Sequence, residues 1–210
     1  MDASPAGSCY EDRSVSMGAA HVYSLLLVLP AGALLVAGFV GAWGLTAFRA
    51  AWHAALDGFG WTLAALVGGI VLHEALHGLA WALFGRTPWS AIRLGFQWKT
   101  LTPYAHCREP MTVRAYRIGA AAPGVVLGLI PAALGLLAGH GLLFLFGFLF
   151  TVAAAGDALI LWLLRQARPG WLVVDHPDRV GCYLLPPGAA GPPSASSTGI
   201  GPDAGRAPGV

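Results

Sequence analysis

His73, Glu74 and His77 form the pattern HEALH in an apolar stretch, residues 61–84, that is otherwise free of charge. On a helix, residues four positions apart project from one face, so the two imidazoles can bind a single Zn²⁺ ion. Glu74 lies beside them, where a metal-dependent hydrolase carries its general base. Ionisable groups are costly within a bilayer and persist there mainly for function. The pattern therefore predicts a zinc-hydrolase centre inside a membrane.

The composition is that of a membrane protein with several spans. The chain is 56% hydrophobic and 10% charged, with a mean hydropathy of +0.65, whereas a soluble domain carries about 25% charged residues. Four stretches can cross a hydrocarbon layer of about 30 Å as helices. They are residues 22–48, 59–84, 117–138 and 142–164. We therefore expect an all-α integral membrane protein with four transmembrane helices.

The basic residues predict the orientation of these helices. Arg49 alone follows the first span, and the other eleven Lys and Arg residues fall on the opposite side. Those eleven are Arg13, Arg86, Arg93, Lys99, Arg108, Arg114, Arg117, Arg165, Arg168, Arg179 and Arg206. The positive-inside rule then predicts a multi-pass protein of the cell membrane with both termini in the cytoplasm. Because topology accounts for the basic residues, we expect no nucleic-acid partner.

A small soluble element is predicted between the second and third spans. Apolar and polar residues alternate over Ile92–Trp98, as in a strand that is half-buried or rests on the membrane. Thr100–Pro103 suits a turn into a second strand, Tyr104–Cys107. This cytoplasmic β-hairpin could dock a substrate by strand addition. Glu109 and Pro110 then resemble the start of the third helix.

The chain divides into three parts by composition. Residues 1–20 form a cytoplasmic N-terminal segment, residues 21–185 the four-helix membrane domain with the metal site, and residues 186–210 a disordered tail rich in Gly, Pro and Ala. A cleaved signal peptide is the alternative for the first span, but its apolar run exceeds the usual length of roughly 7–15 residues. The three cysteines, at positions 9, 107 and 182, are expected to be free thiols.

A hydrolytic zinc ion needs a third protein ligand, and Asp157 is the candidate. It is the only carboxylate other than Glu74 inside the four spans. Asp157 and His77 each lie seven residues before the cytoplasmic end of their span (164 − 157 and 84 − 77), which is about 10 Å of helix. Asp157 could instead accept a helix-packing hydrogen bond. Asp175, and after it His106, are the competing ligands, because their segments could fold back toward the site.

Several segments together resemble a known family. HEALHG, TPYAHCREPMTVRAYRIGAAAPG, AAAGDALILWLL and VVDHPDRVG are similar to membrane zincin metallopeptidases catalogued as a domain of unknown function and related to the site-2 protease class. The resemblance covers roughly residues 60–183. It implies that His73 and His77 are zinc ligands, Glu74 the catalytic base and Asp157 the third ligand. Site-2 proteases usually place the last ligand before a glycine, whereas here Gly156 precedes Asp157.

The expected function is that of a zinc-dependent intramembrane metallopeptidase with Zn²⁺ as its cofactor. Its partners would be the lipid bilayer and a membrane-protein or peptide substrate, hydrolysed near the cytoplasmic face with Glu74 as the base. Two alternatives remain open: a non-catalytic metal-binding scaffold or assembly protein, and a membrane metallohydrolase with a non-peptide substrate such as a lipid. The two histidines could also be structural residues or haem ligands.

Overall fold

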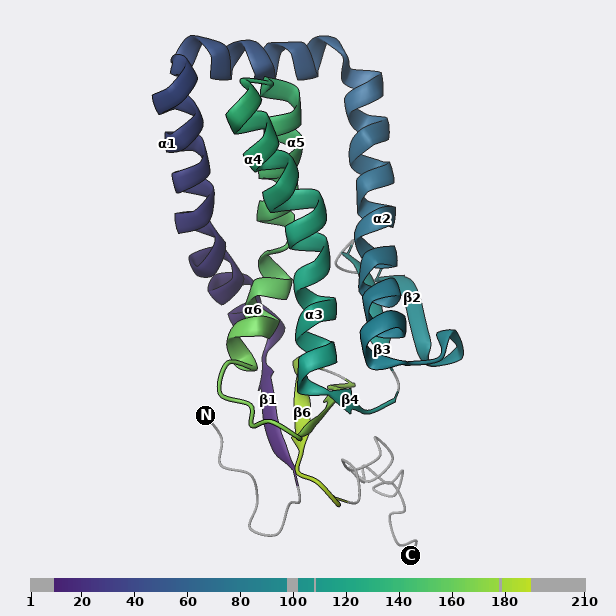
Figure 1. Cartoon of the computed structure of the whole chain (residues 1–210). Coiled ribbons are helices and arrows are strands. Elements are labelled where there is room, and N and C mark those ends of the chain that lie inside the picture. The colour runs from purple at the N-terminus through teal and green to yellow at the C-terminus, as the bar shows by residue number, and fades with distance from the viewer. Residues whose placement is uncertain (1–9, 98–101, 108, 178, 190–210) are drawn as a thin grey trace, which may run out of the picture.

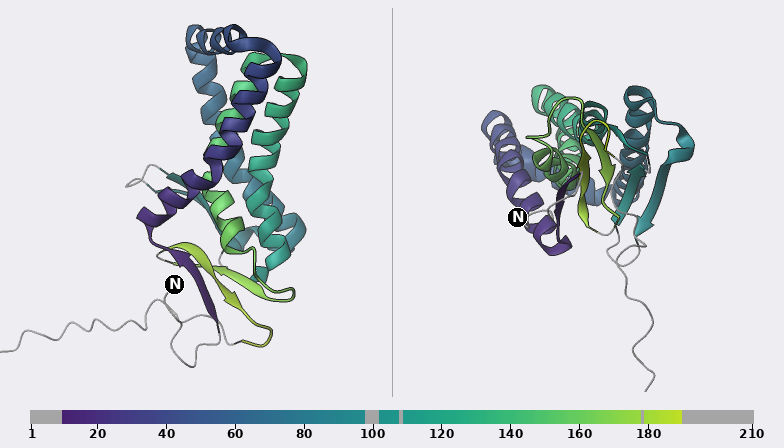
Figure 2. Two further views of the ribbon diagram at one scale, coloured as in Figure 1. Left: turned by 90° about the vertical axis from the view of Figure 1, so that its left-hand side faces the viewer. Right: turned by 90° about the horizontal axis from the view of Figure 1, so that it is seen from below.

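The computed structural model of the chain describes residues 10–97, 102–107, 109–177 and 179–189. Long helices stand side by side, with α3 to α6 between α1 and α2 (Figures 1 and 2). In chain order the helical segments are α1 Met17–Asp57, α2 Phe59–Gly85, η1 Trp89–Ala91, α3 Val113–Pro123, the π-helical η2 Gly124–Leu129, α4 Ile130–Ala138, α5 Gly141–Ala153 and α6 Ala155–Leu163.

Helix α1 is longer than the predicted span 22–48, because it turns rather than stops. It kinks at Gly44, whose φ of 85° is one that side chains rarely adopt. Beyond the kink the helix crosses the end of the bundle above α4 and α5 toward α2 (Figure 1). Ala51 on this crossing part packs in a core with Phe39 and Phe144, whose rings stack at 4.3 Å. This apolar contact fixes the crossing part over the bundle.

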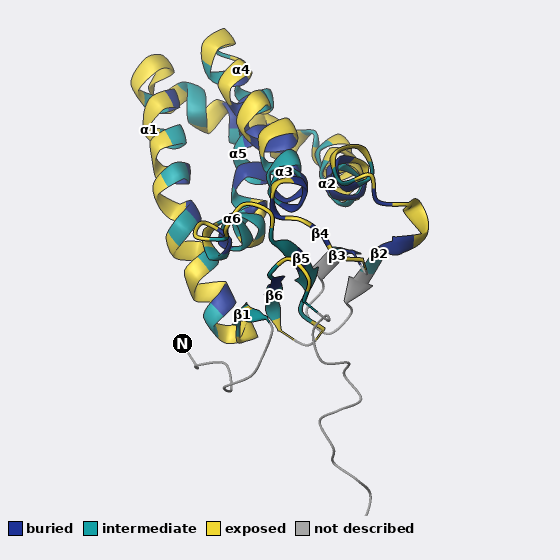
Figure 3. Ribbon diagram, turned by 60° about the horizontal axis from the view of Figure 1, so that its bottom comes forward, coloured by how far each residue is buried: buried dark blue, intermediate teal, exposed yellow. Residues whose placement is uncertain are grey.

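The helices suit a bilayer in length and in surface. Among the described residues, Met17–Asp57, Phe59–Gly85 and Val113–Ala138 are long and apolar enough to cross a membrane, and the bent pair Gly141–Ala153 and Ala155–Leu163 makes a fourth if it counts as one span. Many large apolar side chains of the helices are exposed, and Trp61 is 86% exposed. Figure 3 shows that exposed residues recur along the outer helices. Such a surface indicates a membrane protein, because apolar side chains are unfavourable in water but not in contact with lipid.

The predicted fourth span, 142–164, is not one straight helix. It breaks at Ala154 into α5 and α6, which are bent by 44° relative to one another. The helix of the predicted third span also differs from the prediction: it starts at Val113 instead of near Glu109 and Pro110. Met111 and Thr112 form a short strand before the helix, and Thr112 caps the helix by accepting a hydrogen bond from the Ala115 amide at 3.3 Å.

The predicted hairpin is present in the structure. Strands β2 Ile92–Gln97 and β3 Thr102–Cys107 pair antiparallel, from Ile92 opposite Cys107 to Gln97 opposite Thr102. Trp98, at the end of the predicted strand, and Thr100 and Leu101 of the predicted turn lie outside the described residues. The hairpin lies beside the C-terminal part of α2 (Figure 1).

A second sheet was not predicted, so the fold is mostly helical with two small antiparallel sheets rather than all-α with one hairpin. Its strands are β1 Glu11–Val15, β4 Met111–Thr112, β5 Leu172–Asp175 and β6 Val180–Leu185, in the order β1-β6-β5-β4. The sheet lies at the same end of the bundle as the hairpin (Figures 1 and 2). A shared core joins the sheet, the hairpin, α2 and α3, and includes Trp81, Tyr116, Val173 and Leu184.

The predicted terminal segments can be compared with the structure only in part. Residues 1–9, which include Cys9, and residues 190–210 of the predicted tail lie outside the described residues. Cys107 and Cys182 are free, as expected, and the structure shows that both are buried. The predicted N-terminal segment 1–20 contains strand β1, which pairs with β6 near the other end of the chain.

Candidate metal centre

Helix α2 presents His73 and His77 from its packed face, where they are 8% and 6% exposed. The ring of His77 donates a hydrogen bond from Nδ1 to the Gly119 carbonyl of α3 at 2.9 Å. Gly119 is the residue that allows this approach, since a Cβ at its position would overlap the indole of Trp81. Trp81 in turn stacks against His77, with their ring centroids 5.6 Å apart. The close packing of α2 on α3 therefore sets the orientation of the His77 ring.

Asp157 reaches the two histidines from helix α6. The break at Ala154 places it in the first turn of α6, where exposed backbone N–H groups favour a carboxylate. Its Oδ2 lies 3.1 Å from His73 Nε2, and its Oδ1 lies 3.3 Å from His77 Nε2. The ligand atoms of the three residues all lie within 4.8 Å of one another.

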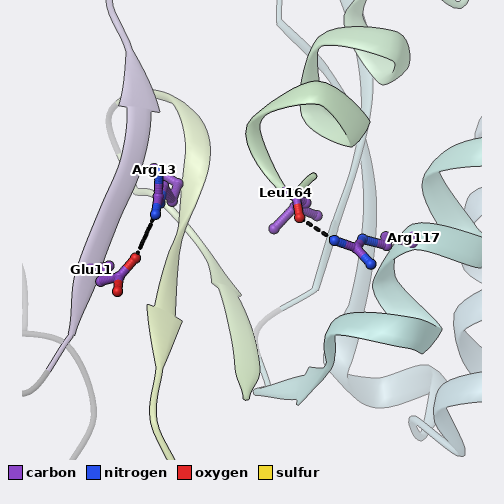
Figure 4. Close-up of polar contacts among 4 residues, drawn as sticks. All are labelled: Glu11, Arg13, Arg117 and Leu164. Atoms are coloured by element: carbon purple, nitrogen blue, oxygen red, sulfur yellow. Dashed lines mark hydrogen bonds and ion pairs between the residues drawn. The ribbon is translucent and has the colours of Figure 1, made fainter. Parts of the chain in front are cut away.

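Helix α6, which carries Asp157, also contacts α3. The Arg117 guanidinium of α3 donates a hydrogen bond to the carbonyl of Leu164, at the C-terminal end of α6 (Figure 4). A cation suits this position because the last carbonyls of a helix have no partner within the helix. Figure 4 also shows the ion pair between Glu11 and Arg13 on β1, at 2.7 Å, which lies apart from this contact.

The arrangement fits a bound cation. Because His77 Nδ1 donates to Gly119, its Nε2 carries a lone pair in the neutral ring, and that lone pair faces the Asp157 carboxylate. Two acceptors in such contact are stable only with a proton or a cation between them. Among the described residues, Asp157 Oδ2 and Glu74 Oε2 are buried with no hydrogen-bond donor. Two imidazoles and one carboxylate form a ligand set typical of catalytic zinc, so these residues fit the ion.

Glu74 lies beside the three converging groups rather than among them. Its side chain lines a cavity of about 960 Å³ together with His73, His77 and Asp157. The cavity continues from the helices to the hairpin and to the turn between β5 and β6. Water and an extended chain therefore have room next to the carboxylate of Glu74.

Asp175 and His106, the competing ligands, also line this cavity but are engaged with each other. Asp175 accepts hydrogen bonds from the Cys107 amide at 2.9 Å and from the Tyr116 hydroxyl, and its Oδ2 lies 3.1 Å from His106 Nδ1. Burial raises the pKa of Asp175, and the neighbouring His106 and the two hydrogen-bond donors oppose that rise. In the part of the chain that the structure describes, neither residue belongs to the converging ligand group.

The sequence analysis does not assign Tyr116, Arg93, His176 or Arg179 to the site, although all of them line the cavity. Tyr116 is buried, with 5% of its surface exposed, and its ring stacks on Trp81. Nothing in its local sequence distinguishes it from a core tyrosine. The segment VVDHPDRVG, quoted above for its resemblance, contains His176 and Arg179. This segment is the one feature of the sequence that points to this side of the cavity.

Comparison with known proteins adds the family. Searches of curated proteins and of solved structures found no match. The sequence model of one family, described as "Putative zincin peptidase", matches residues 66–172, which is 107 of the 210 residues. The match contains the HEALH pattern, Gly119 and Asp157. With more than half of its length matched, the chain belongs to this zincin peptidase family.

Proposed function

We propose that the protein is a zinc-dependent intramembrane metallopeptidase of the site-2 protease type. The observation that carries the proposal is the convergence of His73, His77 and Asp157, with Glu74 in the same cavity, on helices suited to span a membrane. Membership of a zincin peptidase family supports it independently.

Each residue of the site has a definite part in this proposal. His73 and His77 through Nε2, and Asp157 through its carboxylate, would hold the zinc ion. Bound zinc polarises a carbonyl oxygen and brings the pKa of water toward about 7. Glu74 accepts a proton from the attacking water and returns it to the leaving amine nitrogen. The Gly119 carbonyl holds His77 in the tautomer that leaves Nε2 free to bind.

The substrate must meet the site unwound, because a transmembrane helix keeps its carbonyls in i→i−4 hydrogen bonds. Strand β2 pairs with β3 on one edge, and among the described residues no strand pairs with its other edge. We propose that this free edge holds a membrane-protein segment extended next to the cavity. The excess of basic residues supports placing this end of the bundle, and both termini, in the cytoplasm.

Substitution of the base tests the proposal most directly. Purified Glu74→Gln protein should retain about one zinc per chain and lose hydrolysis of unwound transmembrane peptides by roughly 10²-fold or more. Replacing His73 and His77 by Ala should remove both zinc and activity. Zinc content measured by atomic emission, beside peptide cleavage measured by mass spectrometry, separates binding from catalysis. Full activity in Glu74→Gln would contradict the assignment of the base.

A metal-binding scaffold and a hydrolase of lipids are the competing functions. The family description favours peptidase over both. A wild-type protein that binds zinc but cleaves neither peptides nor lipid esters would point to the scaffold. Cleavage of lipid esters alone, lost in Glu74→Gln, would point to the lipid hydrolase.

A further inference from the structure

The strands contribute a set of basic residues to the cavity that the proposed chemistry does not use. On one side are Arg93 of β2 and His106 of β3, which lie directly opposite each other in the hairpin. On the other are His176 and Arg179 in the connection between β5 and β6. We call these four residues the basic wall. Cross-strand partners share one face of a sheet, so Arg93 and His106 face the same way.

The two arginines of the basic wall are not paired with the acidic residues that line the described part of the cavity. Asp175 is occupied by the Cys107 amide, the Tyr116 hydroxyl and His106. Asp157 and Glu74 belong to the metal end of the cavity. Among the described residues, no carboxylate lies within ion-pair distance of Arg93 or Arg179, and both are exposed.

Positive residues near a membrane surface are common, and topology alone would place them here. Their position in the cavity is a further fact, because topology does not require that residues from a hairpin and from a separate sheet line the cavity that contains His73, His77 and Asp157. Guanidinium groups bind carboxylates with two parallel hydrogen bonds. A substrate passing along the cavity would therefore meet two arginines that can pair with its acidic side chains.

We propose that the basic wall is a substrate subsite that selects segments carrying Asp or Glu near the bond to be cleaved. The inference rests on the proposed function, since it names the substrate class of the same site. Arg93 and Arg179 bind the acidic side chains, while Asp175 positions His106 beside them. Phosphate groups of anionic lipids share this chemistry with carboxylates, and the experiment separates the two.

The test measures binding rather than turnover. Full-length, zinc-loaded Glu74→Gln protein in phosphatidylcholine nanodiscs is titrated with three fluorescent peptides of one apolar, proline-interrupted sequence, which carry an Asp-Glu, Ser-Asn or Lys-Arg pair near the centre. Fluorescence anisotropy should show the acidic peptide binding about tenfold more tightly than the neutral one. Arg93→Glu/Arg179→Glu, introduced in the same background, should abolish or reverse this order.

Controls distinguish the subsite from general charge and from misfolding. Arg114→Glu makes the same charge change on an exposed residue that does not line the cavity, and it should keep the acidic preference. Arg93→Gln/Arg179→Gln should lose the preference with zinc content and thermal unfolding unchanged. Equal binding of the three peptides, or an acidic preference that survives both double substitutions, would overturn the inference.

The lipid arm repeats the titration with about one third phosphatidylglycerol in the nanodisc. Peptide preference that persists there supports a peptide subsite. The Glu74→Gln protein could instead lose its preference for the acidic peptide in these nanodiscs while its affinity for the neutral peptide is unchanged. That result would assign the basic wall to lipid headgroups and overturn the inference. Hydrolysis by the wild-type protein is measured separately. An acidic preference without any peptide cleavage would contradict the proposed function while leaving the subsite in place.

Discussion

Two partly buried aspartates line one cavity, and their different neighbours predict different roles. Each carboxylate oxygen of Asp157 lies near a histidine Nε2, and its Oδ2 has no hydrogen-bond partner among the described residues. The carboxylate of Asp175, in contrast, accepts hydrogen bonds from Tyr116 and the Cys107 amide and lies against His106. A carboxylate that lacks donors gains most from a metal ion, because burying an unpaired charge is costly. The sequence alone left both aspartates as possible ligands.

Replacing these aspartates in turn should separate their roles. Asp157→Ala should weaken zinc binding by about two orders of magnitude or more, since it removes one of three protein ligands. Asp175→Ala should leave the zinc stoichiometry near one per chain and act on turnover or stability. Zinc titration against a fluorescent chelator measures both affinities. Equal loss of zinc from the two variants would show that Asp175 also binds the metal.

Cys182 gives a prediction about pH. The side chain is 0% exposed on β6, and its burial, with the nearby charge of Asp175, raises its pKa from 9.0 to about 12. Cys182 should therefore resist iodoacetamide at pH 8 in the folded protein and react after denaturation. Because the pKa is raised by folding, this thiol contributes stability fully below pH 9.0 and loses it as the pH rises toward 12. Rapid labelling of Cys182 in folded protein, detected by mass spectrometry, would contradict its burial.

Among the elements, the contact of α2 with α3 controls the orientation of His77, one of the proposed metal ligands. Gly119 lies against Trp81, which is enclosed between His77 and Tyr116 and cannot easily turn away. The same glycine accepts the hydrogen bond from His77. A change in the spacing of these two helices should therefore reach the metal directly.

Gly119→Ala should cost about 1–3 kcal/mol of stability through overpacking and should also weaken zinc binding. Gly68→Ala is the matched control, because a Cβ at that position of α2 meets no atom within 4 Å. It should leave zinc binding unchanged and stabilise the helix by up to roughly 1 kcal/mol. Unfolding in detergent, followed by circular dichroism, measures the stability. Equal effects of the two substitutions would contradict the close contact of Gly119 with Trp81.

For the whole molecule, both sheets lie at one end of the bundle, and the crossing part of α1 that carries Arg49 lies at the other (Figure 1). Strand β1 precedes the first helix and strands β5 and β6 follow the last one. If the bundle crosses a membrane, the chain on both sides of it must therefore emerge on the same face. The distribution of Lys and Arg predicts that this face is the cytoplasmic one.

Protease protection in intact cells tests this orientation. Epitope tags at the N-terminus and at the C-terminus should both survive protease added outside, and both should be cleaved after the membrane is permeabilised. A tag inserted near Gly58, between α1 and α2, should be cut from outside. The opposite pattern would reverse the orientation and move the metal site toward the other face of the membrane.

The local features of this protein can be predicted from its sequence. The spacing of His73 and His77 places both on one face of a helix, and hydrophobicity predicts the second span, 59–84, to within one residue of α2, because both effects act within a single segment. The alternation over Ile92–Trp98 likewise predicts β2, since successive side chains of a strand point to opposite faces.

Long-range contacts decide the rest. Glu11 pairs with Leu184, 173 residues along the chain, and no local pattern specifies such a partner. The contact of Asp157 with His73 and His77 joins α6 to α2, and the enclosure of Asp175 by Tyr116 and His106 likewise joins separate segments. Side chains from segments far apart in sequence meet only when the chain folds. For this reason the basic wall and the separate roles of the two aspartates emerge from the folded arrangement and not from the order of residues.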